Sequence, residues 1–600
     1  MKQKPAPSRA SSPGKLGRLS SFKRLAPLLG RRRWTVVGIV AGSAAAGLAE
    51  ATLLAVVAHI AAAMTTGNNR PTVGFGPIAL QARIPVLLIV AGILAVVRLA
   101  LQLAVAALPP RVSGEVQSQL RSRLFGSYLY ASWPVKAKER EGHLQELMGG
   151  QTQQAGLAVL QLGNGLSAAL SFLMLAASAF LISAGVAATI MGMAAVLFAG
   201  LRPMSRLVRR RSAATSAASL AQASGVAESV RMAEEVDVFG AWEAERSRIN
   251  SLVETVKENF VRTKTLSAIV PVLYQGAVIS LLIVGLWVVY ALGTGRLAAL
   301  GAVVLLLVRA SSYGQTLQGA YQGLGESLPY LLRVTNAIEH YRASERRPGH
   351  RPIDSIRAAE FESVSYSYQP QRPVLLDIDF SIRVGEAVGV VGPSGAGKST
   401  LVQILVRLRE PLNGSYRVNS VPAAEIEDAA WHRKIAYLPQ EPHLIRGTVA
   451  ENIRFHRDWV DDGAIERAAR SAHMHAAITS WPDGYETVIG QRADAVSVGQ
   501  KQRLCLARAL AGSPAFLILD EPTSSLDLES ERLIQHALEE LRGSLTLFVV
   551  AHRLTMLSLC DRVMVIRDGR LEAFASTDLL YESNEFYRRA VDLATADGSP

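Results

Sequence analysis

Residues 392–400 read Gly392-Pro393-Ser394-Gly395-Ala396-Gly397-Lys398-Ser399-Thr400, and this stretch decides the fold of the second half of the 600-residue chain. It lies between an apolar run predicted as a strand, 387–391, and a predicted helix, 401–407, and it matches the pattern G-x-x-x-x-G-K-[ST]. Glycines let backbone N–H groups converge on phosphates, and the helix N-terminus adds positive potential. We therefore expect residues 392–400 to bind a nucleoside triphosphate, with Lys398 neutralising the terminal phosphates and Ser399 ligating Mg²⁺.

Two carboxylates follow a second apolar run. Residues 516–519 predict a buried strand, which ends at Asp520 and Glu521. Taken alone, such a pair is typical of a strand that meets a surface turn. Behind a phosphate-binding loop the two acids acquire separate roles: Asp520 is expected to hold Mg²⁺, and Glu521 to polarise the attacking water as general base. A base in this place predicts a hydrolase rather than a nucleotide sensor.

A third segment lies between these two and reads Val496-Ser497-Val498-Gly499-Gln500-Lys501-Gln502-Arg503, before a helical run, 504–510. It resembles the signature sequence of ATP-binding cassette (ABC) proteins. Six further features occur in the order of that family: Tyr368, the loop 392–400, Gln440, Asp520-Glu521, Ser525-Leu526-Asp527 and His552. The resemblance covers residues 359–585 and implies an α/β P-loop cassette that uses ATP and Mg²⁺.

The resemblance also assigns residues to the nucleotide. It implies that Tyr368 stacks on adenine, that Gln440 contacts Mg²⁺ and the γ-phosphate, and that His552 hydrogen-bonds the γ-phosphate. Without the resemblance, Tyr368 would be an ordinary strand aromatic and His552 a structural histidine. The signature is implied to bind the nucleotide held by a facing subunit, so that one chain supplies half of each site. Ser497 and Gly499 are assigned to this contact, and Val498, Gln500 and Asp527 are also predicted to bind nucleotide.

The signature departs from the usual Leu-Ser-Gly-Gly-Gln at Val496 and Val498. Valine does not readily adopt the positive φ open to glycine, and it adds bulk near a phosphate contact. Impaired hydrolysis is therefore one expectation. Against it, Ser-Val-Gly-Gln followed by Cys-Leu-Ala-Arg-Ala-Leu resembles the second cassette of multidrug-resistance-associated transporters, where valine accompanies working signatures. We favour a functional site.

The first half of the chain is predicted to span a membrane. The whole sequence is 49% hydrophobic and only 19% charged, and its long apolar runs lie before residue 335. Six stretches reach the roughly 20 residues of helix that cross a bilayer. They are 34–64, 84–108, 154–182, 186–205, 268–292 and 297–320. They resemble the exporter-type membrane domain of ABC proteins, so the predicted fold class is an α-helical transmembrane domain followed by an α/β P-loop ATPase cassette domain.

The charge pattern predicts which loops of the membrane domain lie in the cytoplasm. The two long connections, 109–153 and 206–267, are charged, whereas the other loops are short and poor in Lys and Arg, so the positive-inside rule places the long connections and both termini in the cytoplasm. The first 33 residues carry ten Lys or Arg and no acid, which we interpret as a membrane-surface anchor rather than a nucleic-acid-binding arm. The only cysteines, Cys505 and Cys560, form no disulfide framework, which fits a reducing cytosol.

The predicted domains are a basic cytoplasmic segment (1–33), a membrane domain (34–335), a linker rich in charge and turn formers (336–357) and a nucleotide-binding domain (358–590). The two long connections are predicted as helices that continue the spans beyond the bilayer. Pro134 interrupts the first near residues 131–140, and Gly240 interrupts the second near residues 232–242. We expect these two turns to contact the cassette domain.

Ionisable residues at mid-depth of a span mark functional or paired positions, because a charge in hydrocarbon costs a few kcal/mol. Glu50, Arg98 and Arg309 are such residues. A Glu50 to Arg98 pair between the first two spans is one interpretation, and a cavity wall that touches substrate is the other. A polar face on the last span, consistent with a water-filled cavity, comprises Gln315, Gln318, Tyr321 and Gln322.

These features predict an ATP hydrolase coupled to transport. The resemblance implies a half-transporter that dimerises with an identical or different subunit and exports a hydrophobic or amphipathic substrate (a lipid, peptide, natural product or drug) across the plasma membrane, as in the inner or cell membrane of a bacterium. The cassette would be cytoplasmic, and no nucleic-acid partner is expected. An importer of siderophore-like cargo and an ATP-gated channel remain as alternatives, whereas the six spans exclude a soluble cassette of translation or DNA repair.

Overall fold

The computed structural model describes residues 33–66, 72–75, 78–182, 184–291, 297–490, 496–523, 526–551 and 553–597. They divide into two compact units. The first extends to Glu345 and is helical apart from one short hairpin, and the second begins at Arg346 and is an α/β domain that also includes the short segment Ser132–Pro134. The order of a helical part before an α/β part is the one that the sequence predicts.

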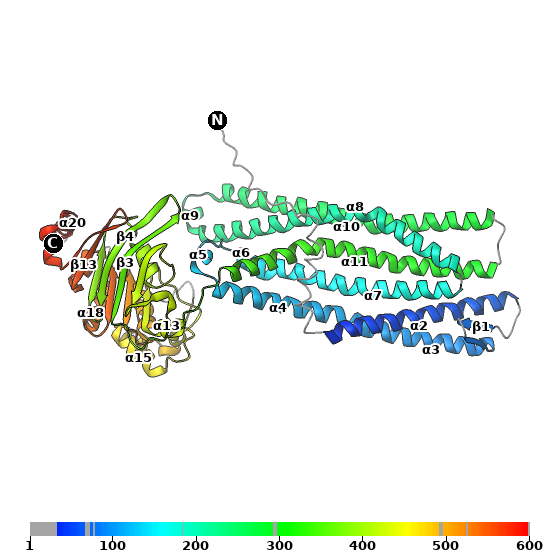
Figure 1. The fold of residues 1–600 in the computed structure, drawn as a ribbon, viewed down its shortest axis with the longest axis horizontal. Helices are drawn as coiled ribbons and strands as arrows, with labels where there is room; N and C mark the ends of the chain where they lie inside the picture. Colours follow the sequence, from blue (N-terminus) through cyan, green and yellow to red (C-terminus); the bar gives the residue numbers. More distant parts are fainter. Residues whose placement is uncertain are drawn as a thin grey trace, which may run out of the picture. The chain divides into compact units, whose positions relative to one another are not determined.

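Long helices build the first unit (Figure 1). They are α2 (Arg33–Thr66), α3 (Ile84–Ala106), α4 (Leu108–Tyr130), α7 (Thr152–Ile182), α8 (Ala184–Arg231), α10 (Trp242–Ala291) and α11 (Leu297–Ala343). By length and composition, the described stretches 34–61, 84–130 and 143–178 are helical and apolar enough to cross a membrane. A hairpin of β1 (Thr72–Phe75) and β2 (Ile78–Gln81), which the sequence did not predict, separates α2 from α3 in the chain.

The core of the first unit follows from helical spacing. One face of α4 is buried against α7 and α11. Its buried residues include Val112, Val116, Leu120 and Leu124. Ile338 and Tyr341 of α11 join this core, and the Tyr341 hydroxyl donates a hydrogen bond of 2.8 Å to Glu139. Residues 336–343, which we predicted as the start of the linker, are therefore helical, because their apolar face continues the packed surface of α11.

The two long connections turn where breakers were expected. In the first, α4 is followed by α5 (Trp133–Lys136), α6 (His143–Glu146) and the π-helical turn η2 (Leu147–Gln151). In the second, α9 (Ala233–Val238) lies between α8 and α10, and Gly240 has a φ of +60° in the left-handed region that glycine tolerates.

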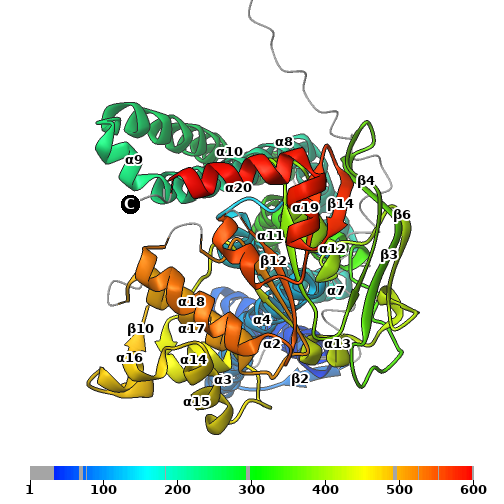
Figure 2. The same ribbon diagram turned by 90° about the vertical axis from the view of Figure 1, so that its left-hand side faces the viewer.

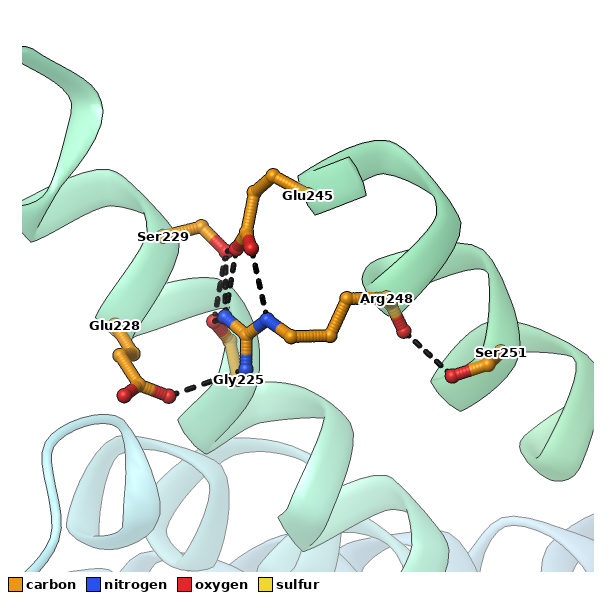
Figure 3. Close-up of polar contacts among 6 residues, drawn as sticks. All are labelled: Gly225, Glu228, Ser229, Glu245, Arg248 and Ser251. Atoms are coloured by element: carbon orange, nitrogen blue, oxygen red, sulfur yellow. Dashed lines mark hydrogen bonds and ion pairs between the residues drawn. The ribbon is translucent and has the colours of Figure 1, made fainter. Parts of the chain in front are cut away.

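A polar network joins α8 to α10, the two helices that form a helical hairpin around α9 (Figure 3). Arg248 of α10 donates to both carboxylate oxygens of Glu245, at 2.6 and 2.9 Å. Its guanidinium also reaches across to α8, where it lies 3.2 Å from the Ser229 hydroxyl, 3.2 Å from Glu228 and 3.3 Å from the Gly225 carbonyl oxygen. Hydrogen bonds from Arg248 and Ser229 hold the pKa of Glu245 at about 2, so the clamp is ionic at neutral pH.

A six-stranded and a four-stranded sheet, with helices packed against them, form most of the second unit. The larger sheet has the order β14-β13-β5-β12-β11-β8, in which every neighbouring pair is parallel except β13 with β14. Its strands are β5 (Ala387–Val391), β8 (Ile435–Leu438), β11 (Phe516–Asp520), β12 (Thr546–Val550), β13 (Arg562–Arg567) and β14 (Arg570–Ala575). The smaller, antiparallel sheet joins β4 (Arg372–Arg383), β3 (Ala358–Gln369), β6 (Asn413–Val418) and β7 (Val421–Pro422).

Alternating side chains of the parallel strands enter two cores. Phe516 and Ile518 of β11 pack with α12 (Lys398–Leu405) and the smaller sheet, whereas Leu517 and Leu519 pack with helices on the other face. Those helices include α14 (Val449–Arg454), α15 (Asp462–Ser471), α16 (His475–Ser480), α17 (Val498–Leu510) and α18 (Leu528–Leu541). Figure 2 shows them opposite β3, β4 and β6. Burial of both faces explains why these strands are continuous apolar runs.

The remaining elements are short. Helix α13 (Asp428–Lys434) precedes β8, and a two-residue ladder pairs β9 (Gly447–Thr448) with β10 (Val488–Ile489). Helices α19 (Thr577–Ser583) and α20 (Glu585–Asp597) follow β14. Both cysteines, Cys505 and Cys560, are free and buried in this unit.

Candidate nucleotide site

The predicted site residues follow the carboxyl ends of neighbouring parallel strands. The loop 392–397 follows β5, Asp520 is the last residue of β11, Glu521 comes directly after it, and Gln440 follows β8. Since β8 pairs with β11, β11 with β12 and β12 with β5, these ends meet at one edge of the sheet. Ligands of open α/β sheets bind at this edge. His552, predicted to follow β12, lies outside the described residues, as does Ser525.

The loop has the conformation that its glycines permit. Gly395 and Gly397 have φ values of +82° and +104°, and a Cβ atom on Gly397 would lie 2.7 Å from Leu375. Helix α12 begins directly after Gly397, so the unpaired N–H groups of its first turn border the loop. The Lys398 ammonium donates to the carbonyl oxygens of Gly392 and Pro393, at 2.8 and 3.1 Å. Burial lowers the pKa of Lys398, although Glu521 and Asp520 oppose that shift.

The two carboxylates lie in different surroundings. Asp520 is buried, and burial followed by the charge of Glu521 raises its pKa, whereas the Tyr437 hydroxyl at 3.4 Å lowers it. Glu521 stands at a φ of +48°, its backbone N–H donates 3.0 Å to the Val550 carbonyl oxygen, and its side chain accepts 2.8 Å from the Gln440 amide. A non-glycine residue in the left-handed region is a strained position of the kind found at functional sites.

The predicted adenine platform is half-exposed. Tyr368 leaves β3 with its hydroxyl 3.0 Å from the Thr400 hydroxyl of α12, which fixes the ring beside the loop. The Arg409 guanidinium lies 4.6 Å from the centre of the Tyr368 ring and donates 2.8 Å to the Tyr366 hydroxyl. Sequence reasoning missed Arg409, because no motif marks it and only the fold brings it to the platform.

The signature begins a helix. Ser497 caps α17: its hydroxyl accepts from the Gln500 N–H at 3.2 Å, while the Gln500 side chain accepts from the Ser497 N–H at 3.0 Å. Val498 is the first residue of α17, is exposed and does not have a positive φ, so the strain that we expected for valine is absent. Gly499 is the position that needs glycine, because a Cβ atom there would lie 2.6 Å from the Cβ atom of Ser530 in α18.

Two further hydrogen bonds involve the helices α17 and α18 next to the signature. Asp527, which we assigned to the nucleotide, caps α18 by accepting 3.3 Å from the Ser530 N–H. Gln502, buried in α17, donates 2.8 Å to the carbonyl oxygen of Pro522, the residue after Glu521. Sequence reasoning missed this contact and that of Tyr437, because each needs the tertiary structure.

The intramembrane charges form one cluster rather than a pair. Glu50 of α2 is 2% exposed, with Arg98 Nε 3.1 Å from its carboxylate. Arg309 and Tyr313 of α11 both donate to the same carboxylate, and the Arg309 guanidinium lies 5.1 Å from the centre of the Tyr313 ring. The Glu50 to Arg98 pair is therefore present, and Arg309 is added to it. The i,i+4 spacing of Arg309 and Tyr313 is a signal that sequence reasoning did not use.

The four residues of the predicted polar face of α11 differ in burial and in contacts. Gln318 and Gln322 are buried at 2% and 3% exposure, and their side-chain amides have no hydrogen-bond partner in the part of the chain that the structure describes. Gln315 is partly buried, and Tyr321 packs on Phe198 with ring centres 5.1 Å apart. Tyr321 also borders a cavity of about 150 Å³, with Arg206 and Arg209.

A larger cavity of about 260 Å³ lies between α2, α3, α7 and α11. Among its lining side chains are Ser43, Gln102, Asn164 and Tyr313. None of the seven predicted substrate residues lines it, although Tyr313 joins it to Glu50.

The residues of the sheet edge fit ATP. The glycine conformations, the helix N-terminus and Lys398 form an anion site, and Tyr368 offers an aromatic surface beside it. Hydroxyl, amide and carboxylate oxygens from Ser399, Gln440 and Asp520 are the oxygen donors that Mg²⁺ prefers.

Comparisons with known proteins agree with this geometry. Residues 375–524 match the family model described as ABC transporter. The chain is 33% identical over 386 residues, 61% of this chain and 63% of the relative, to the ATP-dependent lipid A-core flippase of Chromobacterium violaceum. It is 39% identical over 210 residues, 35% of this chain and 25% of the relative, to ATP-binding cassette sub-family B member 6 of Homo sapiens. The matches span 18 to 63% of the length of the curated relatives.

The fold also has a solved counterpart. The structure of a bacterial Atm1-family ABC exporter with ATP bound superimposes with a TM-score of 0.83 at 22% identity, over 95% of this chain and 99% of that chain. The similarity extends over the helical unit as well as the cassette, and it confirms the predicted fold class. The chain is therefore a multi-pass membrane protein with the fold of an ABC exporter, in which a helical membrane domain is fused to a cassette domain whose residues 375–524 match the ABC transporter family model.

Proposed function

We propose that this chain hydrolyses ATP and uses it to export a hydrophobic or amphipathic substrate. One observation carries the proposal: the phosphate loop, Asp520, Glu521 and Gln440 share a sheet edge in a chain that also has apolar helices long enough to span a membrane. A base beside the nucleotide favours turnover over sensing.

Each residue at the edge has a separate task. Lys398 and the N–H groups of α12 would bind and orient the phosphates, and Ser399, Gln440 and Asp520 would hold Mg²⁺. Mg²⁺, when bound, neutralises charge that develops on the phosphates. Glu521 accepts the proton of the attacking water, and Gln440 positions the Glu521 carboxylate through their hydrogen bond of 2.8 Å. His552 is proposed to hydrogen-bond the γ-phosphate.

The active form is proposed to be a dimer of half-transporters. Ser497 and Val498 are exposed at the N-terminus of α17, where a helix dipole and free N–H groups suit a phosphate of a second subunit. Gly499, Gln500 and Asp527 would complete that contact. ATP contacts that form only across the closed dimer supply the differential binding that shifts the membrane domain between two states. The partner is a second copy of this chain or a different half-transporter.

The turn around α9 is proposed to transmit the change. Val238, Phe239 and Trp242 are exposed there, at 73%, 79% and 59%. Three large apolar side chains at the tip of a hairpin form a small docking surface. The Arg248 network keeps the hairpin rigid, so that a displacement of its tip reaches α8 and α10. Residues 131–140 would make the second contact.

The cargo is proposed to be amphipathic, and the location to be the plasma membrane with a cytoplasmic cassette. A flippase of lipid A-core among the relatives supports a lipid-like cargo, and the multidrug transporter MDR5 of Trichophyton rubrum, 41% identical over 239 residues, supports a broader range. The cluster around Glu50 gives the membrane domain a polar centre that an amphipathic molecule could contact.

Inside-out vesicles test the function directly. The purified chain, reconstituted with Mg²⁺-ATP outside, should accumulate a cargo found by screening for stimulated ATPase activity, and a Lys398→Ala variant should not. ATP-driven loss of cargo preloaded into the same inside-out vesicles would identify an importer, and ATP-dependent ionic currents without cargo movement would identify a channel. Mass measurement of the detergent-purified complex gives its subunit composition.

A further inference from the structure

Two histidines and a glutamate, none of them assigned to the nucleotide, meet on the surface of the cassette. His473 lies in the turn between α15 and α16, and His536 and Glu540 lie one helical turn apart on α18. The i,i+4 spacing places the last two on one face of the helix. His536 Nδ1 is 3.2 Å from His473 Nε2 and 3.1 Å from Glu540 Oε1, and His473 Nε2 is 3.6 Å from Glu540 Oε2.

These distances match those between ligand atoms around a small metal ion. Zinc binds imidazole nitrogen and carboxylate oxygen at about 2.0–2.2 Å in tetrahedral geometry, so two of its ligand atoms stand about 3.3–3.5 Å apart. The two imidazole nitrogens are 3.2 Å apart, and each lies near a different oxygen of the Glu540 carboxylate, at 3.1 and 3.6 Å, so all three separations are close to that value. An ordinary helical His–Glu pair accounts for only one of the three contacts, and the third ligand comes from another element.

We propose that His473, His536 and Glu540 bind a divalent transition-metal ion, with Zn²⁺ the best fit. Two imidazoles and one carboxylate form the donor set that zinc uses with an open position for water, and imidazole selects against Mg²⁺ and Ca²⁺. The side chains are 28%, 60% and 50% exposed, so the ion can enter from solvent and keep water in its remaining position.

The backbone at His473 supports a built site. His473 has a φ of +48°, in a region that few non-glycine residues adopt, and strain of this kind marks positions that the surroundings must hold. Arg503 of α17 holds it by donating 2.7 Å to the His473 carbonyl oxygen. A bound ion would therefore tie α18 to the turn after α15, and through Arg503 to α17, which begins at the signature.

Equilibrium binding of Zn²⁺ and Co²⁺ to the tag-free, full-length chain in nanodiscs tests the proposal. Millimolar Mg²⁺ is included to fill the nucleotide-site carboxylates, and nucleotide is omitted because it chelates zinc. We expect one Zn²⁺ per chain and, with Co²⁺, the intense visible absorption of tetrahedral cobalt. His536→Ala and Glu540→Gln should each weaken binding at least about tenfold, the lower bound for disturbing a metal site. His473→Asn should do the same while keeping a residue that tolerates a positive φ.

His475→Ala is the matched control. His475 lies two residues from His473 and 3.9 Å from Glu466, and it shares a hydrogen bond with Tyr485, but among the described residues it belongs to no group of three potential metal ligands. Its zinc affinity should equal that of the wild type. Hydrogen exchange should also slow on zinc addition at residues 471–476 and 534–541 in the wild type and in His475→Ala, but not in the three ligand variants. Wild-type affinity in all three ligand variants, or zinc binding lost equally in His475→Ala, would overturn the proposal.

Discussion

The Gln440 amide donates a hydrogen bond of 2.8 Å to the Glu521 carboxylate, and this contact joins the ends of the paired strands β8 and β11. Gln440 and Glu521 lie 81 positions apart in the sequence, and their contact depends on the parallel register in which Leu519 is opposite Leu438. The proposed base therefore has a defined direction before any nucleotide binds. A rigid base is needed because proton transfer requires heavy-atom distances near 3 Å.

Replacing Glu521 by glutamine should stop turnover without preventing ATP binding. Glutamine keeps the shape and a hydrogen-bond acceptor for Gln440 but accepts no proton, so the ATPase rate should fall by about 10²–10⁴-fold, the usual contribution of a general base. ATP should then remain trapped in a closed dimer, measured as retained radiolabelled nucleotide. Glu529→Gln, on the exposed first turn of α18, is the control and should turn over normally. A Glu521→Gln protein with wild-type turnover would contradict the assignment of the base.

Tyr437→Phe should move the acidic limit of Mg²⁺-dependent ATPase activity to higher pH. Burial and the charge of Glu521 raise the pKa of Asp520, and the Tyr437 hydroxyl, 3.4 Å away, lowers it by stabilising the charged form. Without the hydroxyl the carboxyl keeps its proton to a higher pH, and a proton competes with Mg²⁺. A weak hydrogen bond of about 0.5 kcal/mol corresponds to roughly 0.4 pH unit. The pH profile at subsaturating Mg²⁺ measures it, and a limit that moves to lower pH would contradict the sign.

Glu50→Gln should destabilise the membrane domain more than Arg98→Ala. The cluster holds one carboxylate and two guanidiniums, so losing the carboxylate charge leaves both cations without a counter-charge in a buried place. Breaking such a pair costs about 3–5 kcal/mol. Arg98→Ala leaves the Glu50 to Arg309 pair intact and should cost roughly 1 kcal/mol or less. Thermal unfolding in nanodiscs compares them, with Thr52→Ala on the same helix as control. Equal losses would show that the pairing does not hold the helices.

Arg309→Ala separates the two interpretations of the same cluster. If the Arg309 side chain only neutralises Glu50, its loss should lower the stability while cargo still stimulates the ATPase to the wild-type extent. If it also touches the substrate, stimulation and transport should both fall, and the half-maximal cargo concentration should rise. Unchanged stimulation and transport would exclude a substrate role for Arg309.

Arg248→Ala should loosen the α8–α10 hairpin and uncouple hydrolysis from transport. The Arg248 side chain makes the contacts of Figure 3 that join Gly225, Ser229 and Glu245. Amide exchange should speed up at residues 225–231 and 242–252, and transport should fall more than basal ATPase activity. Since the pKa of Glu245 is lowered to about 2 from 4.5, the clamp is complete above pH 4.5 and is lost only as the pH falls toward 2, so exchange in the wild type should not change between pH 5 and 8 beyond its chemical rate.

Arg246→Ala is the control for this hairpin, because the Arg246 side chain is 71% exposed and only 3.5 Å from Glu243 on its own helix. Its exchange and its ratio of transport to hydrolysis should match those of the wild type. Equal effects of the two substitutions would mean that positive charge at the hairpin, rather than the joining of α8 to α10, sustains coupling.

The sequence predicts those parts of the molecule that local rules control. The apolar runs and the glycines of 392–400 predict the helices, the buried strands and the loop, because periodicity and backbone freedom are properties of short segments. Contacts between distant segments, such as Tyr437 with Asp520 or His473 with His536, 63 positions away, depend on register and packing that no short pattern contains. The error at the linker has the same origin, since the buried Ile338 and Tyr341 extend α11 by tertiary packing.

Val498 shows the limit of reasoning from a family pattern. The expectation of strain assumed that the usual glycine at this place needs a positive φ. The structure gives Val498 the ordinary helical position after a serine cap, and the close approach falls on the next residue, Gly499, which faces Ser530. The packing of α17 on α18 therefore makes Gly499, rather than Val498, the position of the signature that requires glycine.

A pair of substitutions at these neighbouring positions tests that conclusion. Val498→Gly should change the free energy of unfolding by less than about 1 kcal/mol, the cost of glycine in a helix, because the valine side chain is exposed. Gly499→Ala should cost about 1–3 kcal/mol, since the new methyl group would lie 2.6 Å from the Cβ atom of Ser530 and force α17 away from α18. Thermal unfolding of the cassette transition measures both, and the ATPase rate should follow the same order. A larger loss for Val498→Gly would restore the family expectation that this valine is the sensitive position.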